Sequence, residues 1–366
     1  MSSRAGGAPG GAIPRLFHVI AFAIAAGALA CVAQELPPPD EGRTPPAGTA
    51  AAGTVARTPT PVPTLEGTTG LFAVTPGPTV ISSACLQAAS GPATPTPTPD
   101  PRATPRGLPP APAPFVPDPL AEDPALKRRL LDVLGSRAGD YAFFVKDLST
   151  GSGAAHDAGR VFNAASVFKL FVMLEVFNQQ AAGLLDWDDR LTITPYYDGF
   201  GLSPRSTARC QVLTVAEAMD AMMSVSDNAA AVLLQDLVRA PNVNRSIQAL
   251  GLKDSGLFTE GLPVTAADLG LLLEAIVRGA AVSEAASAEM IELMKGEVID
   301  NGLRAGVPAN VPVAHKTGNW SDATHDAGIV FAKDGPYVFV VLSDTDHETS
   351  VIRALSEAAY DYFTSR

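Results

Sequence analysis

The sequence predicts an α+β domain over residues 119–366, in which helices pack on an antiparallel sheet built from both ends of the domain. Three observations predict this class. Two apolar runs of strand length open the domain, and three more close it. The residues between them carry helical periodicity and helix-capping residues. Strands at both ends therefore share one sheet, and the intervening helices pack on it.

The first 33 residues have the features of an export signal. Arg4 and Arg15 precede or border an apolar run at 16–30 that ends in small residues, and the stretch has no acidic residue. The run is short for a membrane span, which needs about 20 residues. Cys31 also fits a bacterial lipoprotein signal, although Ala28 replaces the leucine usual there. Cleavage, lipidation of Cys31 and an uncleaved anchor stay open, and each places the domain outside the cytoplasmic membrane.

Residues 34–118 have the composition of a linker rich in Pro, Thr, Ala and Gly. The chain has 32 prolines among 366 residues, and most of them precede residue 120. Such a stretch buries too little apolar surface to offset its ordering entropy, and its prolines favour an extended, semi-rigid spacer. Apolar islands at 71–74 and 80–85 could form a short strand docked on the domain, but the composition favours disorder.

Composition also limits the partners. The net charge of −12 and the lack of basic runs argue against nucleic-acid binding. The three cysteines and five histidines show no metal-binding spacing, so we expect no metal and no cofactor. Cys85 and Cys210 could pair in an oxidising compartment, but the position of Cys85 in the linker argues against it. We expect a monomer that contacts the membrane only through the N-terminal signal or a lipid on Cys31.

The first half of the domain should run from a helix through a hairpin to a second helix. Leucines at helical spacing precede Gly135, a residue typical of helix ends, and a Gly-containing turn separates the two expected strands. The expected elements are a helix over 121–134, strands over 141–148 and 156–162, a helix that contains Ser166 and ends near Gly183, and loops with short strands over 184–212.

The second half should consist of helices followed by the three closing strands. Thr214 and Glu217 form a capping box at the start of a helix. Thr265 caps a strongly apolar helix, with Asp268 three residues later. The expected elements are helices from 213, from 224, over 265–277 and over 284–294, strands over 311–319, 326–333 and 336–343, and a last helix over 349–363.

Ser166 and Lys169 lie three residues apart in an apolar stretch and would share one face of a helix. A serine hydroxyl needs a base to become a nucleophile at neutral pH. A lysine buried in apolar surroundings loses solvation, which lowers its pKa, and its neutral amine can then accept the proton. The pair alone is a weak signal, because a serine and a lysine on an ordinary core helix give the same pattern.

Two further triplets strengthen the interpretation. Ser226-Asp227-Asn228 lies between two expected helices, where one residue can cap a helix while another faces a cleft. Lys316-Thr317-Gly318 lies on an expected strand, where the lysine and the threonine can hold a carboxylate. The glycine allows a substrate backbone to approach the strand closely. Each triplet alone would be interpreted as a helix cap or a polar strand end.

In their order and contexts, these three motifs resemble those of the serine β-lactamase and penicillin-binding protein superfamily, and of class A β-lactamases in particular. The resemblance covers about residues 119–366. It implies the β-lactamase/transpeptidase-like fold, with an antiparallel sheet, a mainly helical subdomain and a site between them that needs no metal.

The resemblance implies catalytic roles for three residues. Ser166 would be the acylated nucleophile, and Lys169 would be its proton-transfer partner. Ser226 would relay the proton to the leaving nitrogen.

The resemblance also implies how a substrate is held. Asn228 would bind the side-chain amide of the substrate, and Lys316 and Thr317 would bind its carboxylate beside Gly318. Backbone N–H groups of Ser166 and Asn319 would form the oxyanion hole.

Two features of class A β-lactamases are missing. Those enzymes carry a glutamate, in a Glu-x-x-Leu-Asn context, that activates the deacylating water, and the short stretch 250–265 lacks that context. Glu260 is the acid placed to substitute, with Asp254 behind it, although an exposed loop glutamate without a role is the simpler interpretation. An arginine often found after the Lys-Thr-Gly strand is also missing, and His325 stands there as a binding residue or a surface histidine.

These observations predict an exported serine hydrolase. The first hypothesis is a β-lactamase that acylates Ser166 and deacylates slowly, because the usual deacylation base is missing. The alternatives are a D,D-peptidase or other hydrolase of cell-wall peptides or esters, and a penicillin-recognising sensor domain that stays acylated. The expected partner is a small-molecule β-lactam or a cell-wall peptide.

Overall fold

The computed structural model describes residues 80–88, 115–202, 206–258 and 261–365. The expected export signal at 1–33 and most of the expected linker at 34–118 lie outside these ranges. Among the described helices, none combines the length and the hydropathy that a membrane span requires.

A six-stranded sheet forms the centre of the domain, and its strands come from both ends of the domain, as predicted. The strand order is β2-β4-β3-β11-β10-β9, and every pair is antiparallel except β2 with β4. The bounds are β2 (Ala121–Glu122), β3 (Tyr141–Asp147), β4 (Ser152–His156), β9 (Val313–Trp320), β10 (Ala323–Ala332) and β11 (Gly335–Ser343). The α+β class is confirmed, with one short parallel pair added at the sheet edge.

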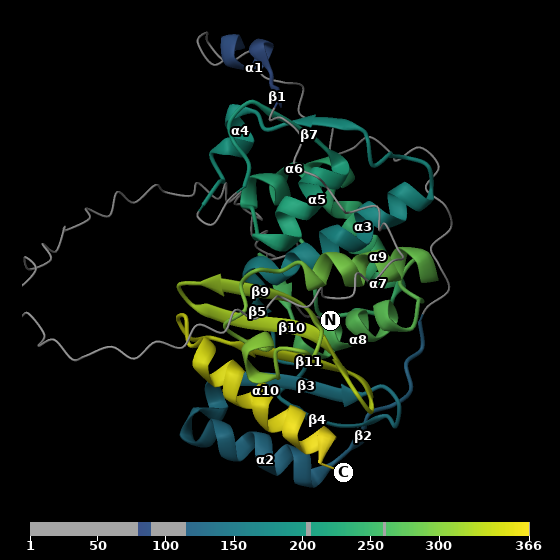
Figure 1. Cartoon of the computed structure of the whole chain (residues 1–366), viewed down its shortest axis with the longest axis vertical. Coiled ribbons are helices and arrows are strands. Elements are labelled where there is room, and N and C mark those ends of the chain that lie inside the picture. The colour runs from purple at the N-terminus through teal and green to yellow at the C-terminus, as the bar shows by residue number, and fades with distance from the viewer. Residues whose placement is uncertain (1–79, 89–114, 203–205, 259–260, 366) are drawn as a thin grey trace, which may run out of the picture. The chain divides into compact units, whose positions relative to one another are not determined.

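One face of the sheet is covered by α2 (Pro124–Leu134) and α10 (Thr349–Thr364), which lie side by side (Figure 1). Leucines of α2 and apolar residues of α10 pack against alternate strand residues such as Phe143 and Phe339. Asp123 caps α2 by accepting from two backbone N–H groups, so the helix begins three residues later than the leucine spacing alone predicts.

The opposite face carries a larger helical layer that leads to the Ser166 region. Its helices are α3 (Lys169–Ala181), α4 (Pro195–Asp198), α5 (Val215–Ser224), α6 (Asn228–Val238), α7 (Ala240–Ala249), α8 (Ala266–Val277) and α9 (Glu284–Lys295). Thr214 and Glu217 form the predicted capping box of α5, and Thr265 caps α8. Local capping chemistry therefore sets the first residues of these two helices.

Two short sheets join segments that are distant in the sequence. β5 (Phe162–Asn163) pairs with β8 (Pro263–Val264), and this pair lies directly before the turn that contains Ser166. β7 (Gln211–Thr214) pairs on one side with β6 (Arg190–Thr192) and on the other with β1 (Val80–Ile81). The second sheet therefore ties a segment of the expected linker to the domain.

Residues 80–88, the N-terminal strap, contradict the expectation of disorder. After β1, α1 (Ser83–Ala88) follows, and Cys85 forms a disulfide with Cys210, 125 residues away in the sequence. The expectation that Cys85 and Cys210 do not pair was also wrong. The two expectations rested on the average composition of the linker, and composition does not reveal the disulfide or the pairing with β7 that hold the strap.

The strand expected over 156–162 is also displaced. The chain pairs with β3 over Ser152–His156, and Asp157 then adopts a φ of 45°, in the left-handed region, which turns the chain away from the sheet. Phe162 and Asn163 pair with β8 instead. The sequence analysis made no prediction for α7, whose buried side chains include the polar Asn242.

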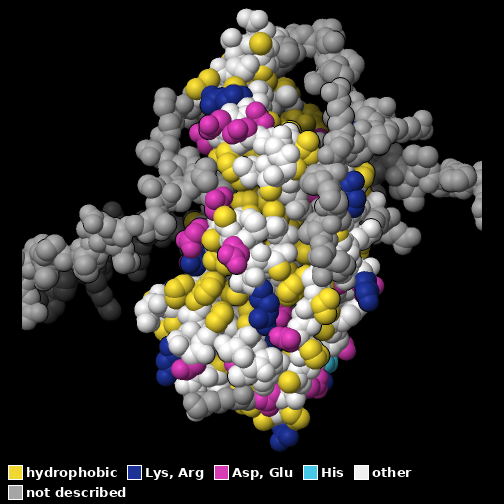
Figure 2. Space-filling view, turned by 90° about the vertical axis from the view of Figure 1, so that its right-hand side faces the viewer, with side chains coloured by type: hydrophobic (Ala, Val, Ile, Leu, Met, Phe, Trp, Pro, Cys, Tyr) yellow, Lys and Arg dark blue, Asp and Glu magenta, His cyan; other side chains and the backbone are white. Residues whose placement is uncertain are grey.

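On the face shown in Figure 2, acidic, basic and hydrophobic side chains of the described residues are interspersed.

Reduction of the disulfide is expected to release the N-terminal strap while the six-stranded sheet stays folded. β1 is exposed on both residues, and most of α1 is exposed, so little buried surface holds the strap once the covalent bond is broken. Hydrogen exchange should show that residues 80–88 and the β7 amides lose protection on reduction, while β10 and β11 keep theirs. Undiminished protection of the strap in the reduced protein would contradict this expectation.

Candidate active site

Ser166 lies in a 3₁₀ turn, Ala165–Phe168, directly before α3. Ala165 has a φ of 43°, so the chain turns sharply in front of the serine through a conformation that non-glycine residues rarely adopt. The Ala164 N–H donates to the Leu262 carbonyl at 2.8 Å and fixes the entry to the turn. The partly exposed Ser166 hydroxyl makes no hydrogen bond to any other described residue, which leaves it free to face a substrate.

Lys169, the first residue of α3, is fully buried. Its Nζ lies 2.6 Å from the Ser226 carbonyl oxygen, 2.9 Å from Ser226 Oγ and 2.7 Å from Asn228 Oδ1. Burial, and after it the positive charge of Lys316, lowers the pKa of Lys169 well below its ordinary value. This is the direction that a lysine needs in order to accept a proton from a serine.

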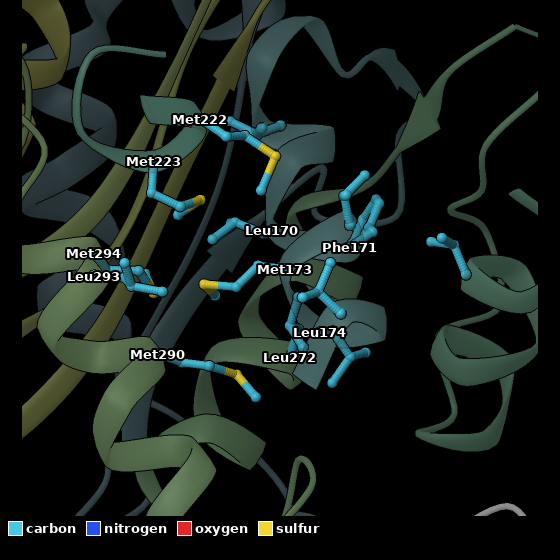
Figure 3. Packing of buried hydrophobic residues seen from close by; sticks show 14 of the residues in the cluster. Leu170, Phe171, Met173, Leu174, Met222, Met223, Leu272, Met290, Leu293 and Met294 are labelled. Atoms are coloured by element: carbon cyan, nitrogen blue, oxygen red, sulfur yellow. The ribbon is translucent and has the colours of Figure 1, made fainter. Parts of the chain in front are cut away.

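The burial of Lys169 follows from the packing of α3. Figure 3 shows Leu170 and Met173 of α3 among methionines of α5 and α9. Methionine is flexible and fills irregular space, so the helix is surrounded by apolar atoms with little room for water. The helix core thereby removes solvent from the amine at its first residue.

The Ser226-Asp227-Asn228 loop combines a capping role with a site role, as expected. Asp227 caps α6 by accepting from the Ala230 N–H at 3.1 Å. Its second carboxylate oxygen accepts from Ser206 N–H and from the N–H and Oγ1 of Thr207, each at 2.9 Å.

With Asp227 fixed in this way, the residues on either side of it point to Lys169. Ser226 has a φ of 61°, a strained conformation for a residue that carries a side chain. Ser226 and Asn228 both contact the Lys169 amine. The structure therefore brings together three of the predicted residues, Lys169, Ser226 and Asn228.

β9 brings the third motif against the Ser166 turn. A Cβ at Gly318 would lie 3.1 Å from both the Ser166 backbone nitrogen and the Ala164 carbonyl oxygen, so glycine permits this close approach. Next to it, the buried Oδ1 atom of Asn319 has no hydrogen-bond partner among the described residues. The predicted oxyanion-hole residues, Ser166 and Asn319, thus lie in adjacent segments that Gly318 allows to meet.

Lys316 and Thr317 reach the site, but both side chains are bound to a residue that the sequence analysis missed. Glu297, which follows α9, forms a buried ion pair with Lys316, and its other carboxylate oxygen accepts from Thr317 Oγ1 at 3.0 Å. Burial raises the pKa of Glu297 and lowers that of Lys316, while their mutual attraction opposes both shifts. No sequence signal marks Glu297, because a single acid after a helix end is usually exposed.

The sequence left two interpretations open for His325, a binding residue or a surface histidine, and the structure places it in the interior instead. It is buried, with Nε2 placed 2.7 Å from the Asn163 carbonyl oxygen and Nδ1 3.2 Å from the Ser343 N–H. Burial lowers its pKa, which favours a neutral ring that donates from Nε2 and accepts at Nδ1. His325 therefore joins the sheet to the segment that leads into the Ser166 turn.

The described residues on either side of 259–260, the segment expected to supply a deacylation base, pack beside the Ser166 turn. The Asn244 side chain bonds both the N–H and the carbonyl of the buried Leu257, and Gly256 N–H donates to the Pro263 carbonyl. Glu260 lies outside the described residues, so its role stays a prediction. Asp254 is exposed, and its backbone N–H donates to the Asp268 carboxylate.

The described residues hold no group of three or more His, Cys, Asp or Glu side chains arranged to bind a metal ion. Independently of that, Lys169 contacts the Ser226 hydroxyl, and Ser166 lies three residues before the lysine. Such a set fits nucleophilic catalysis with acid–base assistance.

Comparison with known proteins identifies the family of this chain. The model of the β-lactamase enzyme family, Beta-lactamase2, matches residues 125–363, more than half of the chain. No curated protein matches the chain.

Solved structures share the fold. PBP-A is 22% identical, with a TM-score of 0.63 over 69% of this chain and 100% of PBP-A. A β-lactamase from Sphaerobacter thermophilus DSM 20745 is 22% identical, with a TM-score of 0.60 over 66% of this chain and 97% of its own. An ancestral class A β-lactamase (GNCA) is 23% identical, with a TM-score of 0.58 over 65% of this chain and 100% of its own. At these identities the likeness concerns the fold.

Proposed function

The chain belongs to the β-lactamase enzyme family as a β-lactamase-like serine hydrolase, and on that premise we propose that it opens β-lactam amides through an acyl-enzyme at Ser166 and hydrolyses the resulting ester slowly. The observation that carries the proposal is the buried Lys169 amine, in contact with Ser226 and one turn from Ser166. A variant of PBP-A has been captured as an acyl-enzyme complex with penicillin G, which supports the same covalent step here.

Acylation requires that one proton leave Ser166 and that one proton reach the leaving nitrogen. Neutral Lys169 accepts the Ser166 proton as Oγ attacks the β-lactam carbonyl, and backbone N–H groups of Ser166 and Asn319 stabilise the oxyanion. Protonated Lys169 then passes a proton to Ser226 Oγ, 2.9 Å away. Ser226 gives its own proton to the ring nitrogen as the C–N bond breaks. The products are an ester at Ser166 and a protonated amine nitrogen, with Lys169 neutral again.

Slow deacylation follows from what surrounds the ester. Hydrolysis requires a water molecule, a base that deprotonates it and space for both. The 250–265 segment lacks the Glu-x-x-Leu-Asn context, and its described part is held by the Asn244 side chain at Leu257 and by the Gly256–Pro263 backbone hydrogen bond. Glu260 or Lys169 would have to serve as the base, so we propose that deacylation limits turnover.

The disulfide supports the proposal that the protein is exported. Disulfides persist in oxidising compartments and are rare in the cytosol, and Cys85–Cys210 links the domain to the segment after the predicted signal. The Pro- and Thr-rich residues before the domain would then serve as a tether at the cell envelope, after cleavage or lipidation at Cys31.

A D,D-peptidase is the second candidate function. The missing deacylation context favours it, because a penicillin-recognising peptidase forms the acyl-enzyme without needing efficient hydrolysis of the β-lactam ester. Release of D-alanine from a D-Ala-D-Ala peptide would distinguish it from a β-lactamase.

Stopped-flow kinetics with a chromogenic cephalosporin test the proposal. The expected result is a burst equal in amplitude to the enzyme concentration, followed by a slow steady rate, because the acyl-enzyme accumulates when deacylation limits turnover. The Glu260→Gln variant should keep the burst. Fast turnover without a burst, destroyed by Glu260→Gln, would contradict slow deacylation and identify Glu260 as an efficient base.

A further inference from the structure

Glu297 binds the side chains of Lys316 and Thr317, the two that the third motif would use to hold a substrate carboxylate. One carboxylate oxygen pairs with Lys316 Nζ, and the other accepts from Thr317 Oγ1 at 3.0 Å. The side chains of Glu297 and Lys316 are both 0% exposed, so this is a desolvated pair rather than a surface contact. Among the described residues, Glu297 is the sole hydrogen-bond acceptor for the Lys316 ammonium.

The two cations that share a cavity with Glu297 among the described residues already have partners. Glu297 lines a cavity of about 280 Å³ beside the start of β9, together with Lys295 and Arg304. Lys295 is paired with Glu292, and the Arg304 guanidinium donates to backbone carbonyls at 307–309. A carboxylate that left Lys316 would therefore meet cations that already have partners, so the pair is held in place.

Beside the pair, the described residues place two further basic groups, His315 and Lys169. Burial opposes a charge on His315, but Asp326 and then Glu297 raise its pKa, so carboxylates already balance that charge. His315 lies between Lys316 and Ala314 on β9, and it is engaged by the buried Asp326 carboxylate at 3.0 Å. Lys169 loses its charge more readily than an ordinary lysine, because burial and Lys316 lower its pKa. A second carboxylate placed beside Glu297 would meet a like charge at short range in a site that excludes water.

We propose that Glu297 is a specificity-determining residue that makes this site select esters or amides whose leaving-group side is uncharged, and disfavour those that carry a carboxylate there. The inference rests on the proposed function in one respect, that Ser166 is the residue acylated. It assigns to Glu297 the contacts that the resemblance gives to a substrate carboxylate. Lys316 and Thr317 then hold Glu297 in the wall of the site.

A matched pair of acylating agents tests the proposal. The pair is a chromogenic cephalosporin with a free C4 carboxylate and its methyl ester, and the readout is the second-order rate constant for acylation of Ser166. The wild-type protein should react about tenfold or more faster with the ester than with the acid. Glu297→Gln should shift that ratio toward the acid by about tenfold or more, because it removes the like charge that an incoming carboxylate would meet.

The control variant removes a carboxylate from a comparable buried pair elsewhere; this carboxylate, that of Glu274, also accepts from Arg278 at 2.9 Å. Glu274 forms a buried ion pair with Lys146 on β3, at 2.7 Å, and the two side chains are 2% and 1% exposed. β3 is separated from β9 by β11 and β10. Glu274→Gln should lower the unfolding temperature without changing the ester-to-acid ratio. A wild-type preference for the acid, or an unchanged ratio in folded Glu297→Gln, would overturn the proposal.

A second pair of probes separates this inference from the proposed function. An aryl phosphonate with a carboxylate and its methyl ester both react by displacement of phenolate by Ser166 Oγ, which requires no turnover. If the phosphonates label Ser166 with the expected charge preference while cephalosporins are not hydrolysed, the β-lactamase proposal fails and the role of Glu297 stands. If cephalosporins are hydrolysed and wild-type protein prefers the anionic phosphonate, the role of Glu297 fails. The wild-type comparison does not require any variant to fold.

Discussion

Replacing Ser166 with alanine is expected to abolish covalent modification by β-lactams and to lower hydrolysis by about 10⁶-fold, the order of loss that follows removal of a serine nucleophile. The turn at Ala165–Phe168 carries the hydroxyl three residues before Lys169, and Gly318 brings β9 against the Ser166 backbone nitrogen. The Ser166 hydroxyl makes no hydrogen bond to another described residue, so its removal should leave no unpaired buried group. The free energy of unfolding should therefore change by less than about 0.5 kcal/mol.

Intact-protein mass spectrometry after incubation with a β-lactam checks this prediction. Ser149→Ala is the matched control, because Ser149 is an exposed serine in the turn between β3 and β4. The control should be labelled as fully as the wild type. Full labelling of a folded Ser166→Ala variant would assign the acyl group to another residue and would refute the site.

The elements that could be predicted from sequence are those set by local interactions. The Thr214–Glu217 capping box and the Thr265 cap begin α5 and α8 because each side chain bonds a backbone group only three residues away. Asp227 likewise caps α6 from within its own motif. The period-two and helical patterns gave the α+β class for a similar reason, since each reflects the neighbours of a residue along its own element.

The features that escaped prediction depend on contacts between distant segments. Glu297 and Lys316 are 19 residues apart, His325 and Asn163 are 162 apart, and Cys85 and Cys210 are 125 apart. No periodicity or capping rule records such a contact. The motif residues could therefore be identified from sequence, but the Glu297 carboxylate that binds Lys316 and Thr317 could not.

The second large effect is expected when Lys169 is replaced. Lys169→Ala is expected to slow acylation of Ser166 by about 10²–10⁴-fold, the usual contribution of a general base. The amine is buried and contacts Ser226 and Asn228, so alanine also removes the first member of the relay to the leaving nitrogen. Stopped-flow acylation rates measure the loss. Wild-type rates in a folded Lys169→Ala protein would contradict the proton-transfer role.

Lys169→Arg separates a base from a source of positive charge. Arginine can keep a positive charge and hydrogen bonds near Ser226, but it does not deprotonate in proteins. If Lys169 acted only as a cation, the arginine variant would retain most of the acylation rate. We expect instead a loss close to that of Lys169→Ala, because neither variant can accept the Ser166 proton.

The pH dependence of acylation identifies the titrating group, and its sign follows from the direction of the pKa shift. Below its pKa, Lys169 is an ammonium that cannot accept a proton; above it, the amine is free to do so. The acylation rate should therefore rise with pH through the pKa of Lys169 and then level off. Because burial and the charge of Lys316 lower that pKa, the rise should occur well below the pH at which an ordinary lysine titrates. Lys169→Arg should show no such rise, and a rise that persisted unchanged in that variant would assign it to another group.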